Sequence, residues 1–313
     1  MLGQAVVAQL QALGHGVLVS GREVDVGQAS SVLAYGHKHR PTHIINCAAY
    51  TKVDQCESDL AAAEAANAKG PAHLAQAAAA LAVPIVHVST DYVFDGAARA
   101  PYTEQAACSP LGAYGRSKLA GEQAFWAALA DAPLAAVGYV VRTSWLFGHG
   151  GPNFVQTMLR LMAQKRQFGV VADQWGRPTY CDDLAVAIAA LLGLEQADLA
   201  ACAPGVYHFA NTGAVSWFDF ATGIFEQAQA RSIPLTCVGI QAIGTQDYPT
   251  PAQRPAYSVL STDKIAQALG YAPRAWQQAL AAYLTRHWQG VQAANAAPNT
   301  SLSSALTPFD PLS

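Results

Sequence analysis

The fold is decided by residues 83–96, VPIVHVSTDYVFDG. Residues 83–88 form a continuous apolar run, which is typical of a strand that is buried on both faces of a parallel sheet. The polar residues Thr90, Asp91 and Tyr92 follow directly. Because ligands of doubly wound sheets bind beyond the carboxyl ends of the strands, we expect these three residues to lie at a ligand-binding crevice.

Predicted strands and helices alternate on both sides of this stretch. Helices are expected at 2–13, 29–39, 60–81 and 118–129, and strands at 16–20, 43–46, 83–88 and 137–141. This rhythm predicts an α/β fold with a doubly wound, Rossmann-like parallel sheet. Beyond residue 145 the pattern changes, with helices at 153–164, 180–194, 217–231, 263–268 and 276–288 and strands at 169–171 and 205–210.

Three regions follow from this pattern and from the chain length. A dinucleotide-binding domain is expected at 1–144, and residues 180–211 return to it. A smaller C-terminal domain for the substrate is expected mainly at 145–288. The tail at 289–313 is rich in Ala, Asn, Pro and Ser and is predicted to be disordered.

A Tyr-x-x-x-Lys pair lies downstream of the deciding stretch, at Tyr114 and Lys118. A phenol with a pKa of ~10 is a weak acid at neutral pH, and a lysine one helical turn away stabilises the phenolate. Such a pair alone often occurs by chance as a solvated helix pair. Together with the Thr90 hydroxyl, it provides what is needed to move a proton onto a carbonyl oxygen while hydride reaches the carbon, which predicts a reductase.

Composition favours a cytoplasmic enzyme. The formal net charge is −3, which makes nucleic acid an unexpected partner, and the chain has no long uninterrupted apolar run of the kind that spans a membrane. The N-terminus lacks the basic start of a signal peptide. The six cysteines show no Cys-x-x-Cys spacing, which favours reduced thiols.

These motifs make the chain resemble the extended short-chain dehydrogenase/reductases, and among them the dTDP-4-dehydrorhamnose reductase family. The matching segments, which extend from Leu2 to about Trp288, are NCAAYTKVD (46–54), STDYVFDG (89–96), YGRSK (114–118), RTSW (142–145), DQWGRPT (173–179) and Arg254-Pro255. The strings at 89–96 and 142–145 are more particular to this family than the Tyr-x-x-x-Lys pair.

The resemblance implies roles for individual residues. Tyr114 would donate the proton to the C4 keto oxygen, Lys118 would tune Tyr114 and hold the nicotinamide ribose, and Thr90 would hydrogen-bond the same oxygen. The residues implied to bind the cofactor are Leu2, Gly3, Gly21, Arg22, Asp25, Val26, Ala48, Ala49, Tyr50, Thr51, Val88, Tyr114 and Lys118. Those expected to bind the substrate are Thr90, Asp91, Tyr92, Trp145, Asn153 and Arg254, and Phe154, Gln174 and Pro255 are further candidates.

Simpler interpretations of several of these residues stay open. Trp145 could be an ordinary core aromatic residue and Arg254 a member of a structural ion pair. Arg22 suits the 2′-phosphate of NADPH, although a solvated surface arginine is the alternative and NADH also remains open. His37 and His39 alternate at a helix end without nearby carboxylates or thiols, so no metal site is expected there. The resemblance allows a homodimer and Mg²⁺ at its interface, for which the sequence offers no identifiable ligands.

The beginning of the chain departs from the family pattern. The family opens with an apolar strand and a Gly-x-x-Gly-x-x-Gly turn that approaches the cofactor pyrophosphate. This sequence begins at Met1-Leu2-Gly3-Gln4, where only Gly3 matches. Losing a central strand would expose unpaired sheet edges. We therefore expect a start that lies further upstream, rather than a naturally shortened paralogue, because Thr90, Tyr114 and Lys118 are intact.

The expected function is reduction of the 4-keto group of dTDP-4-dehydro-L-rhamnose by NADPH, which gives dTDP-L-rhamnose for polysaccharide synthesis. Another nucleotide-sugar reductase or epimerase is the nearest alternative. A dehydratase would need a Glu after the Thr-Asp pair, and Tyr92 occupies that position. A non-catalytic NADP-binding subunit that resembles the methionine adenosyltransferase beta subunit is the alternative from another class.

Overall fold

A four-stranded parallel sheet forms the centre of the first part of the molecule in this computed structural model, which describes residues 1–21, 23–195 and 200–296, with side chains through residue 286. Its strand order is β1-β2-β3-β8, where β1 is Ile44–Asn46, β2 is Ile85–Thr90, β3 is Gly138–Thr143 and β8 is Gly205–His208. In the register, Thr90 lies opposite Thr143. The carboxyl ends of β2 and β3 therefore meet at one edge of the sheet.

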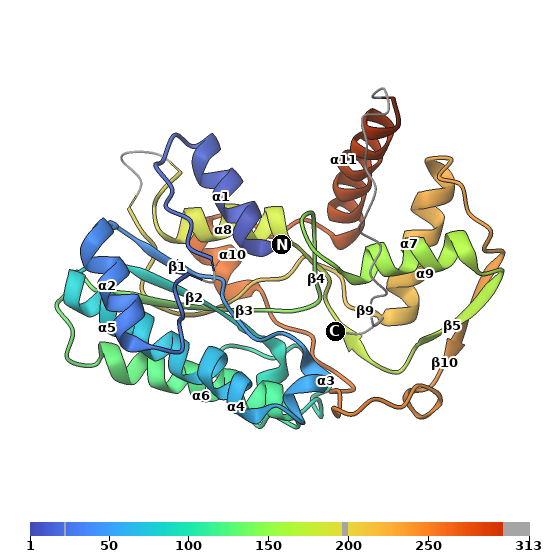
Figure 1. The fold of residues 1–313 in the computed structure, drawn as a ribbon. Helices are drawn as coiled ribbons and strands as arrows, with labels where there is room; N and C mark the ends of the chain where they lie inside the picture. Colours follow the sequence, from blue (N-terminus) through green and yellow to red (C-terminus); the bar gives the residue numbers. More distant parts are fainter. Residues whose placement is uncertain (22, 196–199, 297–313) are drawn as a thin grey trace.

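Helices cover both faces of this sheet (Figure 1). One face carries α1, α8 and α10, and the other carries α2, α5 and α6. These helices and the short ones between them are α1 (Leu2–Ala12), α2 (Ala29–His39), α3 (Val53–Cys56), α4 (Leu60–Ala63), the π-helical turn Glu64–Lys69, α5 (Gly70–Leu81), the 3₁₀ turn Asp91–Val93, α6 (Ala113–Leu129), α8 (Cys181–Leu191) and α10 (Asp263–Leu269). The doubly wound α/β prediction is confirmed.

Each face has its own apolar core. Leu2, Val6 and Leu10 of α1 recur at helical spacing and pack with α8 and the sheet. On the other face, Phe125 of α6 packs against Ile85 and Val140. The sheet is thus buried between two helical layers, as its apolar strands require.

The second part of the molecule lies to one side of the sheet (Figure 1). It contains the amphipathic helix α7 (Phe154–Gln164), α9 (Trp217–Ala230), the 3₁₀ turn Thr245–Asp247 and α11 (Trp276–Ala296), with the short strands β4 (Leu146–Phe147), β5 (Gln167–Val171), β6 (Trp175–Gly176), β7 (Thr179–Tyr180), β9 (Val215–Ser216) and β10 (Gly239–Ile243). Phe147, Phe220 and Tyr283 lie in its core. A capping box between Ser216 and Asp219 fixes the start of α9.

Residues 252–262, called here the crossing segment, contact both parts. Tyr257 forms a β-bridge with Trp175 of β6, and Leu260 forms another with Tyr102, which lies in the loop that follows β2 and the 3₁₀ turn Asp91–Val93. Thr262 accepts a hydrogen bond from Arg177 at 3.2 Å. The segment therefore fixes the loop after β2 relative to the second part.

The predicted strand at 16–20 is wrong. These residues have no strand structure, and the side chains of Leu18 and Val19 are 55% and 63% exposed. A strand needs a hydrogen-bonded neighbour, and within the described chain β1 is the edge of the sheet and pairs only with β2. The apolar pattern of residues 16–20 therefore finds no strand to pair with.

Three helices differ in detail from the prediction. The helix expected at 60–81 contains the π-helical turn Glu64–Lys69, and α6 begins at Ala113, so that Tyr114 lies in its first turn. Helix α11 continues to Ala296, eight residues into the predicted disordered tail, since Gln and Ala there favour a helix. Residues 297–313 of that tail lie outside the described part of the chain.

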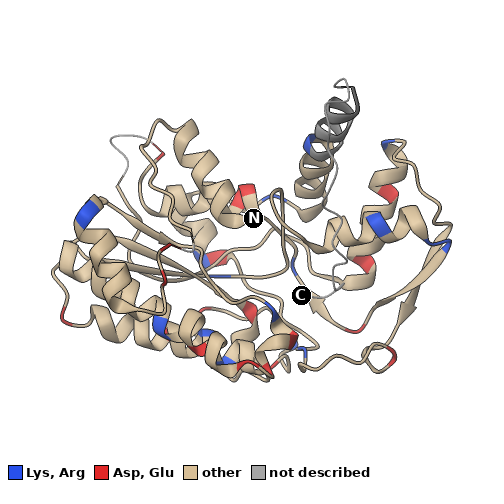
Figure 2. Ribbon diagram, in the orientation of Figure 1, with Lys and Arg blue, Asp and Glu red and all other residues tan. Residues whose placement is uncertain are grey.

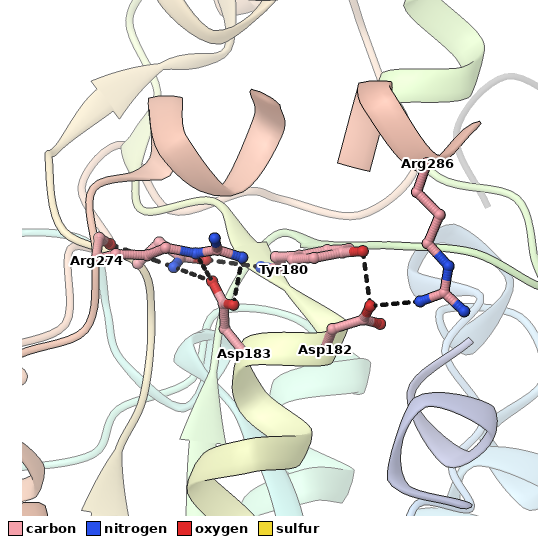
Figure 3. Close-up of polar contacts among 6 residues, drawn as sticks. Tyr180, Asp182, Asp183, Arg274 and Arg286 are labelled. Carbon is pink, nitrogen blue, oxygen red and sulfur yellow. Dashed lines mark hydrogen bonds and ion pairs between the residues drawn. The ribbon is translucent and has the colours of Figure 1, made fainter. Parts of the chain in front are cut away.

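Two aspartates in the first turn of α8 pair with arginines in α11 and in the segment just before it. Asp182 accepts hydrogen bonds from Tyr180 at 2.7 Å and Arg286 at 2.9 Å, and Asp183 pairs with Arg274 at 2.6 Å (Figure 3). Elsewhere, Lys and Arg are interspersed with Asp and Glu along the ribbon (Figure 2). None of the helices described here is long and apolar enough to cross a membrane.

Candidate active site

The candidate site begins where β2 ends. Thr90 is the last residue of β2, and its hydroxyl accepts a hydrogen bond from the Tyr92 backbone N–H at 3.2 Å, which starts the 3₁₀ turn Asp91–Val93. Helix α6 lies directly against this turn. A Cβ at Gly115 would overlap the carbonyl oxygen of Tyr92, so only glycine allows α6 to approach so closely. This contact brings Tyr114 beside Thr90.

Tyr114 is partly buried and packs edge-on against Tyr92, with ring centroids 5.7 Å apart and an interplanar angle of 77°. Burial raises the pKa of the Tyr114 phenol, and the hydrogen bond with Thr90 opposes that rise. The phenol is therefore protonated at neutral pH. A proton donor and a second hydroxyl converge at the carboxyl end of β2.

Lys118 lies one turn further along α6 and is 1% exposed. Its ammonium group donates to the carbonyl oxygen of Val88 at 2.7 Å and lies 3.4 Å from Nε2 of His87. Burial lowers the pKa of Lys118 to about 8, and the nearby charge of Glu122 acts in the opposite direction. Lys118 thus points toward β2, and burial rather than Lys118 sets the direction of the Tyr114 pKa shift.

Asp91 lies beside these residues and is 2% exposed. Its Oδ1 accepts a hydrogen bond from the Thr90 hydroxyl at 3.1 Å, and Oδ2 has no hydrogen-bond partner among the described residues. Burial raises the pKa of Asp91 to about 7, although hydrogen bonds with Ser258 and Thr90 act to lower it. The carboxyl group can therefore carry a proton near neutral pH.

Tyr50, one of the residues expected to bind a cofactor, lies beside Tyr114. The backbone of Tyr50 is held by the Asn67 amide, which accepts from the Tyr50 N–H at 2.8 Å and donates to its carbonyl at 3.0 Å. Tyr50 packs with Tyr114 against Cys56. A Cβ at Gly3 would lie 3.7 Å from Cβ of Cys47, so the start of α1 is close to residues 48–51. The structure thus brings Tyr50 to Tyr114, Lys118 to Val88, and Val88 into one apolar cluster with Leu2, while Gly3 lies beside Cys47, which precedes Ala48, Ala49 and Thr51.

The expected adenosine-side residues form a separate loop beside α5. The Gly21 N–H donates to Glu23 at 2.6 Å, and the Asp25 carboxylate accepts from the Gly27 N–H at 2.9 Å. The Val26 carbonyl accepts a hydrogen bond from His73 of α5 at 2.9 Å. Arg22, on which the NADPH prediction was based, lies outside the described residues.

The second part of the molecule contributes a stack of two tryptophans. The indole rings of Trp145 and Trp217 overlap with centroids 3.4 Å apart and an interplanar angle of 7°. Phe154 packs against Trp217 at 4.5 Å. Trp145 has a φ of +47°, a left-handed conformation that is unusual for a bulky residue. A backbone outlier of this kind supports a functional role for Trp145.

The other predicted substrate residues make structural contacts. Asn153 is the N-cap of α7 and donates to the carbonyl oxygens of Gly148 and Gly151, so the described backbone uses both ends of its amide. Gln174 donates to Thr245 at 3.0 Å. Arg254 pairs with Asp54 at 3.0 Å, which is the structural alternative considered above, yet its Nη1 is buried without a hydrogen-bond partner among the described residues. Pro255 packs against Gly96.

Sequence reasoning missed four residues at this site: His87, Asn67, Glu122 and Trp217. His87 lies within residues 83–96, and a histidine in an otherwise apolar strand could have indicated a buried polar residue near the site. Glu122 is one turn beyond Lys118, and it forms a buried ion pair with Arg142 at 2.6 Å. Trp217 and Asn67 are brought to the site only by the tertiary fold. In the described parts of the chain, no three His, Cys, Asp or Glu side chains are grouped as metal ligands.

Comparison with known proteins places this geometry in a family. The model of the RmlD substrate binding domain matches residues 1–288. A dTDP-4-dehydrorhamnose reductase from Aggregatibacter actinomycetemcomitans is 42% identical over 260 residues, which cover 82% of this chain and 85% of that protein. A dTDP-4-keto-6-deoxy-D-glucose reductase from Streptomyces niveus is 39% identical over 282 residues, 90% of this chain and 92% of that protein.

A solved structure shares the fold. The dTDP-4-dehydrorhamnose reductase of Bacillus anthracis, in complex with NADP, has a TM-score of 0.81 and 34% identity, and the match covers 91% of this chain and 95% of that one. The family resemblance inferred from the motifs is confirmed. The chain belongs to the family defined by the RmlD substrate binding domain.

Proposed function

We propose that the protein reduces the 4-keto group of a dTDP-4-dehydro-6-deoxy sugar with NADPH, and that dTDP-4-dehydro-L-rhamnose is its substrate. The observation that carries this proposal is the convergence of the Thr90 hydroxyl and the Tyr114 phenol at the end of β2, with Lys118 on the next turn of α6. The names of the relatives support the sugar, and the NADP complex of the Bacillus anthracis protein supports the cofactor.

Tyr114 is the proposed proton donor. Because burial keeps the phenol protonated, a carbonyl oxygen within reach of Tyr114 and Thr90 would accept a hydrogen bond from Tyr114 before the reaction, and a second one from Thr90 when its hydroxyl turns from Asp91 to the substrate. As negative charge develops on that oxygen, the Tyr114 proton moves to it. The Lys118 ammonium, four residues further along the same helix, lowers the energy of the resulting phenolate.

The chain carries groups that suit the proposed cofactor, which supplies the hydride when bound. Lys118 donates one N–H to the Val88 carbonyl and lies 3.4 Å from Nε2 of His87, which leaves at least one N–H for a ribose hydroxyl. Ala48 and Ala49 have side chains short enough for close approach of a ligand. The first turn of α1 contains no acidic residue, and its free N–H groups suit a phosphate.

The substrate is proposed to lie between the two parts of the molecule. Asp91 and Tyr92 would contact the sugar from the end of β2, and Trp145 would contact it from the second part. The unpaired Nη1 of Arg254 would meet the diphosphate, where a charged donor is most useful. Asn153 is left out of this proposal because its amide is occupied as a helix cap.

The test is a turnover assay that follows NADPH absorbance with dTDP-4-dehydro-L-rhamnose, and in parallel with dTDP-4-keto-6-deoxy-D-glucose. Tyr114→Phe should lower kcat by about 10²- to 10⁴-fold and leave NADPH binding intact. Tyr35→Phe, which removes a hydroxyl from α2, is the matched control and should keep parental turnover. Turnover of only the second sugar would assign to this protein the substrate named for the Streptomyces niveus relative. NADPH binding without any turnover would support a non-catalytic subunit.

A further inference from the structure

A chain of three buried polar side chains connects β1, β2 and α6. Asn46 ends β1, His87 lies in the middle of β2, and Lys118 belongs to α6; they are 4%, 0% and 1% exposed. The Asn46 amide nitrogen lies 3.0 Å from Nδ1 of His87, and Nζ of Lys118 lies 3.4 Å from Nε2 of the same ring. His87 therefore connects the edge strand to the proposed catalytic lysine.

The orientation of the Asn46 amide is fixed from its other side. Its Oδ1 accepts a hydrogen bond from the Ala48 backbone N–H at 2.9 Å, so its NH₂ group faces His87. A charged lysine is likewise only a donor, and a neutral imidazole has a single acceptor nitrogen. Two donors thus face one ring that can accept from only one of them.

Two arrangements satisfy all three side chains. When Lys118 is uncharged, Nε2–H of His87 donates to the lysine lone pair, and Nδ1 accepts from Asn46 as the structure has it. When Lys118 is charged, Nε2 must accept, so the ring proton lies on Nδ1. That proton needs an oxygen, and Asn46 must turn its amide and give up the Ala48 N–H. One proton passes between Lys118 and solvent in this exchange, and the ring keeps one throughout.

The surrounding charges leave Lys118 as the group that titrates. Burial and the charge of Lys118 hold the pKa of His87 well below its usual range, so the ring stays neutral. Burial raises the pKa of the Cys47 thiol to about 12, which keeps it uncharged as well. Glu122, on the same helix as Lys118, is engaged by Arg142 from β3 and favours the charged lysine.

We propose that His87 is a positioning residue that couples the protonation of Lys118 to the orientation of the Asn46 amide and, through it, to the backbone of residues 48–51. The inference rests on the proposed function, because Lys118 and residues 48–51 are there assigned to the cofactor. It adds a physical link between them, since the same proton that charges the lysine releases the Ala48 N–H. That N–H then becomes available to an oxygen of a bound dinucleotide.

The first test needs no turnover. Histidine nitrogen is isotope-labelled in the full chain, and nuclear magnetic resonance follows the ring tautomers of the nine histidines across a pH titration spanning about 8, the Lys118 pKa. His87→Gln assigns the signal. The expected result is that His87 changes from Nδ1–H to Nε2–H as pH rises and never becomes doubly protonated. A single tautomer throughout the titration overturns the proposal.

The second test compares two variants by the alkaline limb of the pH profile of kcat. His87→Asn keeps a polar group near the place of Nδ1 and removes the acceptor of Lys118. The alkaline limb should therefore shift to lower pH by about one unit. His87→Gln is long enough to place its amide oxygen near the place of Nε2, so the limb should stay at the parental pH. Equal limbs in both variants would mean that His87 is only a packing residue. Failure of the parent to turn over would refute the proposed function while leaving the tautomer test valid.

Discussion

Replacing Asp91 by Asn should make the protein more stable at alkaline pH, an unusual result for a residue at a proposed catalytic site. The folded-state pKa of Asp91 is about 7, against 3.8 for the ordinary group, because burial penalises the charged form. Between these two values the unfolded chain has lost the proton and the folded chain still holds it. Stability from this group is therefore complete below pH 3.8 and is lost as pH rises toward 7.

The size of the effect follows from the shift. Roughly three pKa units at about 1.4 kcal/mol each give an upper bound of about 4 kcal/mol, all of it lost above the folded-state value. At pH ~5 only the first part of this loss has occurred, so the remaining two units amount to about 3 kcal/mol. Asparagine has nearly the same shape and does not titrate. The free energy of unfolding of Asp91→Asn, relative to the parent protein, should therefore increase by about 3 kcal/mol from pH ~5 to pH ~8.

Urea unfolding at the two pH values measures the difference in unfolding free energy between variant and parent. Asp95→Asn is the matched control, because Asp95 lies four residues away in an exposed position and hydrogen bonds from Tyr102 and Ala97 lower its pKa. Asp95 is ionised in both states throughout this range, so its substitution should have the same effect at both pH values. A pH-independent effect of Asp91→Asn would refute the argument that Asp91 is a buried acid.

Three further substitutions test the packing around the site. Glu122→Gln leaves the buried Arg142 guanidinium without its partner and should lower the free energy of unfolding by about 3–5 kcal/mol in urea titrations. Gly115→Ala places a methyl group on the Tyr92 carbonyl and should lower stability by about 1–3 kcal/mol and reduce kcat as well, measured by thermal unfolding and turnover. Trp217→Phe weakens the indole stack and should raise KM for the sugar by about 2- to 10-fold with a smaller change in kcat.

Each of these has a control in the same chain. Adding Arg142→Met to Glu122→Gln removes the stranded charge and should recover much of the lost stability. Gly16→Ala meets no atom within 4 Å and should leave both stability and kcat near the parental values. Trp126→Phe alters a tryptophan that packs on Phe125, away from the stack, and should leave KM unchanged. The packing argument fails if the control and the test substitution in any pair behave alike.

The sequence was sufficient to predict the parts of the fold that depend on local pattern. The run at 83–88 predicted a strand of the central sheet, and the helix expected at 29–39 has the same bounds in the structure. The pattern at 16–20 looked equally good and was wrong, because a strand also needs a neighbour. Strand pairing depends on the whole sheet, so it cannot be inferred from a short segment of sequence.

The site was predictable to a similar extent. Thr90 and Tyr114 meet because Thr90 ends a strand of a doubly wound sheet and Tyr114 lies in the first turn of a helix that packs at the carboxyl end of that strand. The stack of Trp145 on Trp217 joins residues 72 positions apart, and the Asp54–Arg254 pair joins residues 200 apart, so neither could be inferred from spacing. The direction in which Lys118 points was also hidden, since it depends on the acceptors that His87 and Val88 present.

The crossing segment also sets the order in which the protein can be completed. Asp54 is made early, yet its partner Arg254 follows 200 residues later. At a synthesis rate of ~5–20 residues per second, Asp54 would wait roughly 10–40 seconds for Arg254, and Tyr102, in the loop after β2, would wait somewhat less for Leu260. Until the crossing segment has been synthesised, the nascent chain contains Thr90 and Tyr114 but lacks the contacts of this segment that fix the loop after β2. Catalytic competence therefore comes last, when nearly the whole chain has left the exit tunnel.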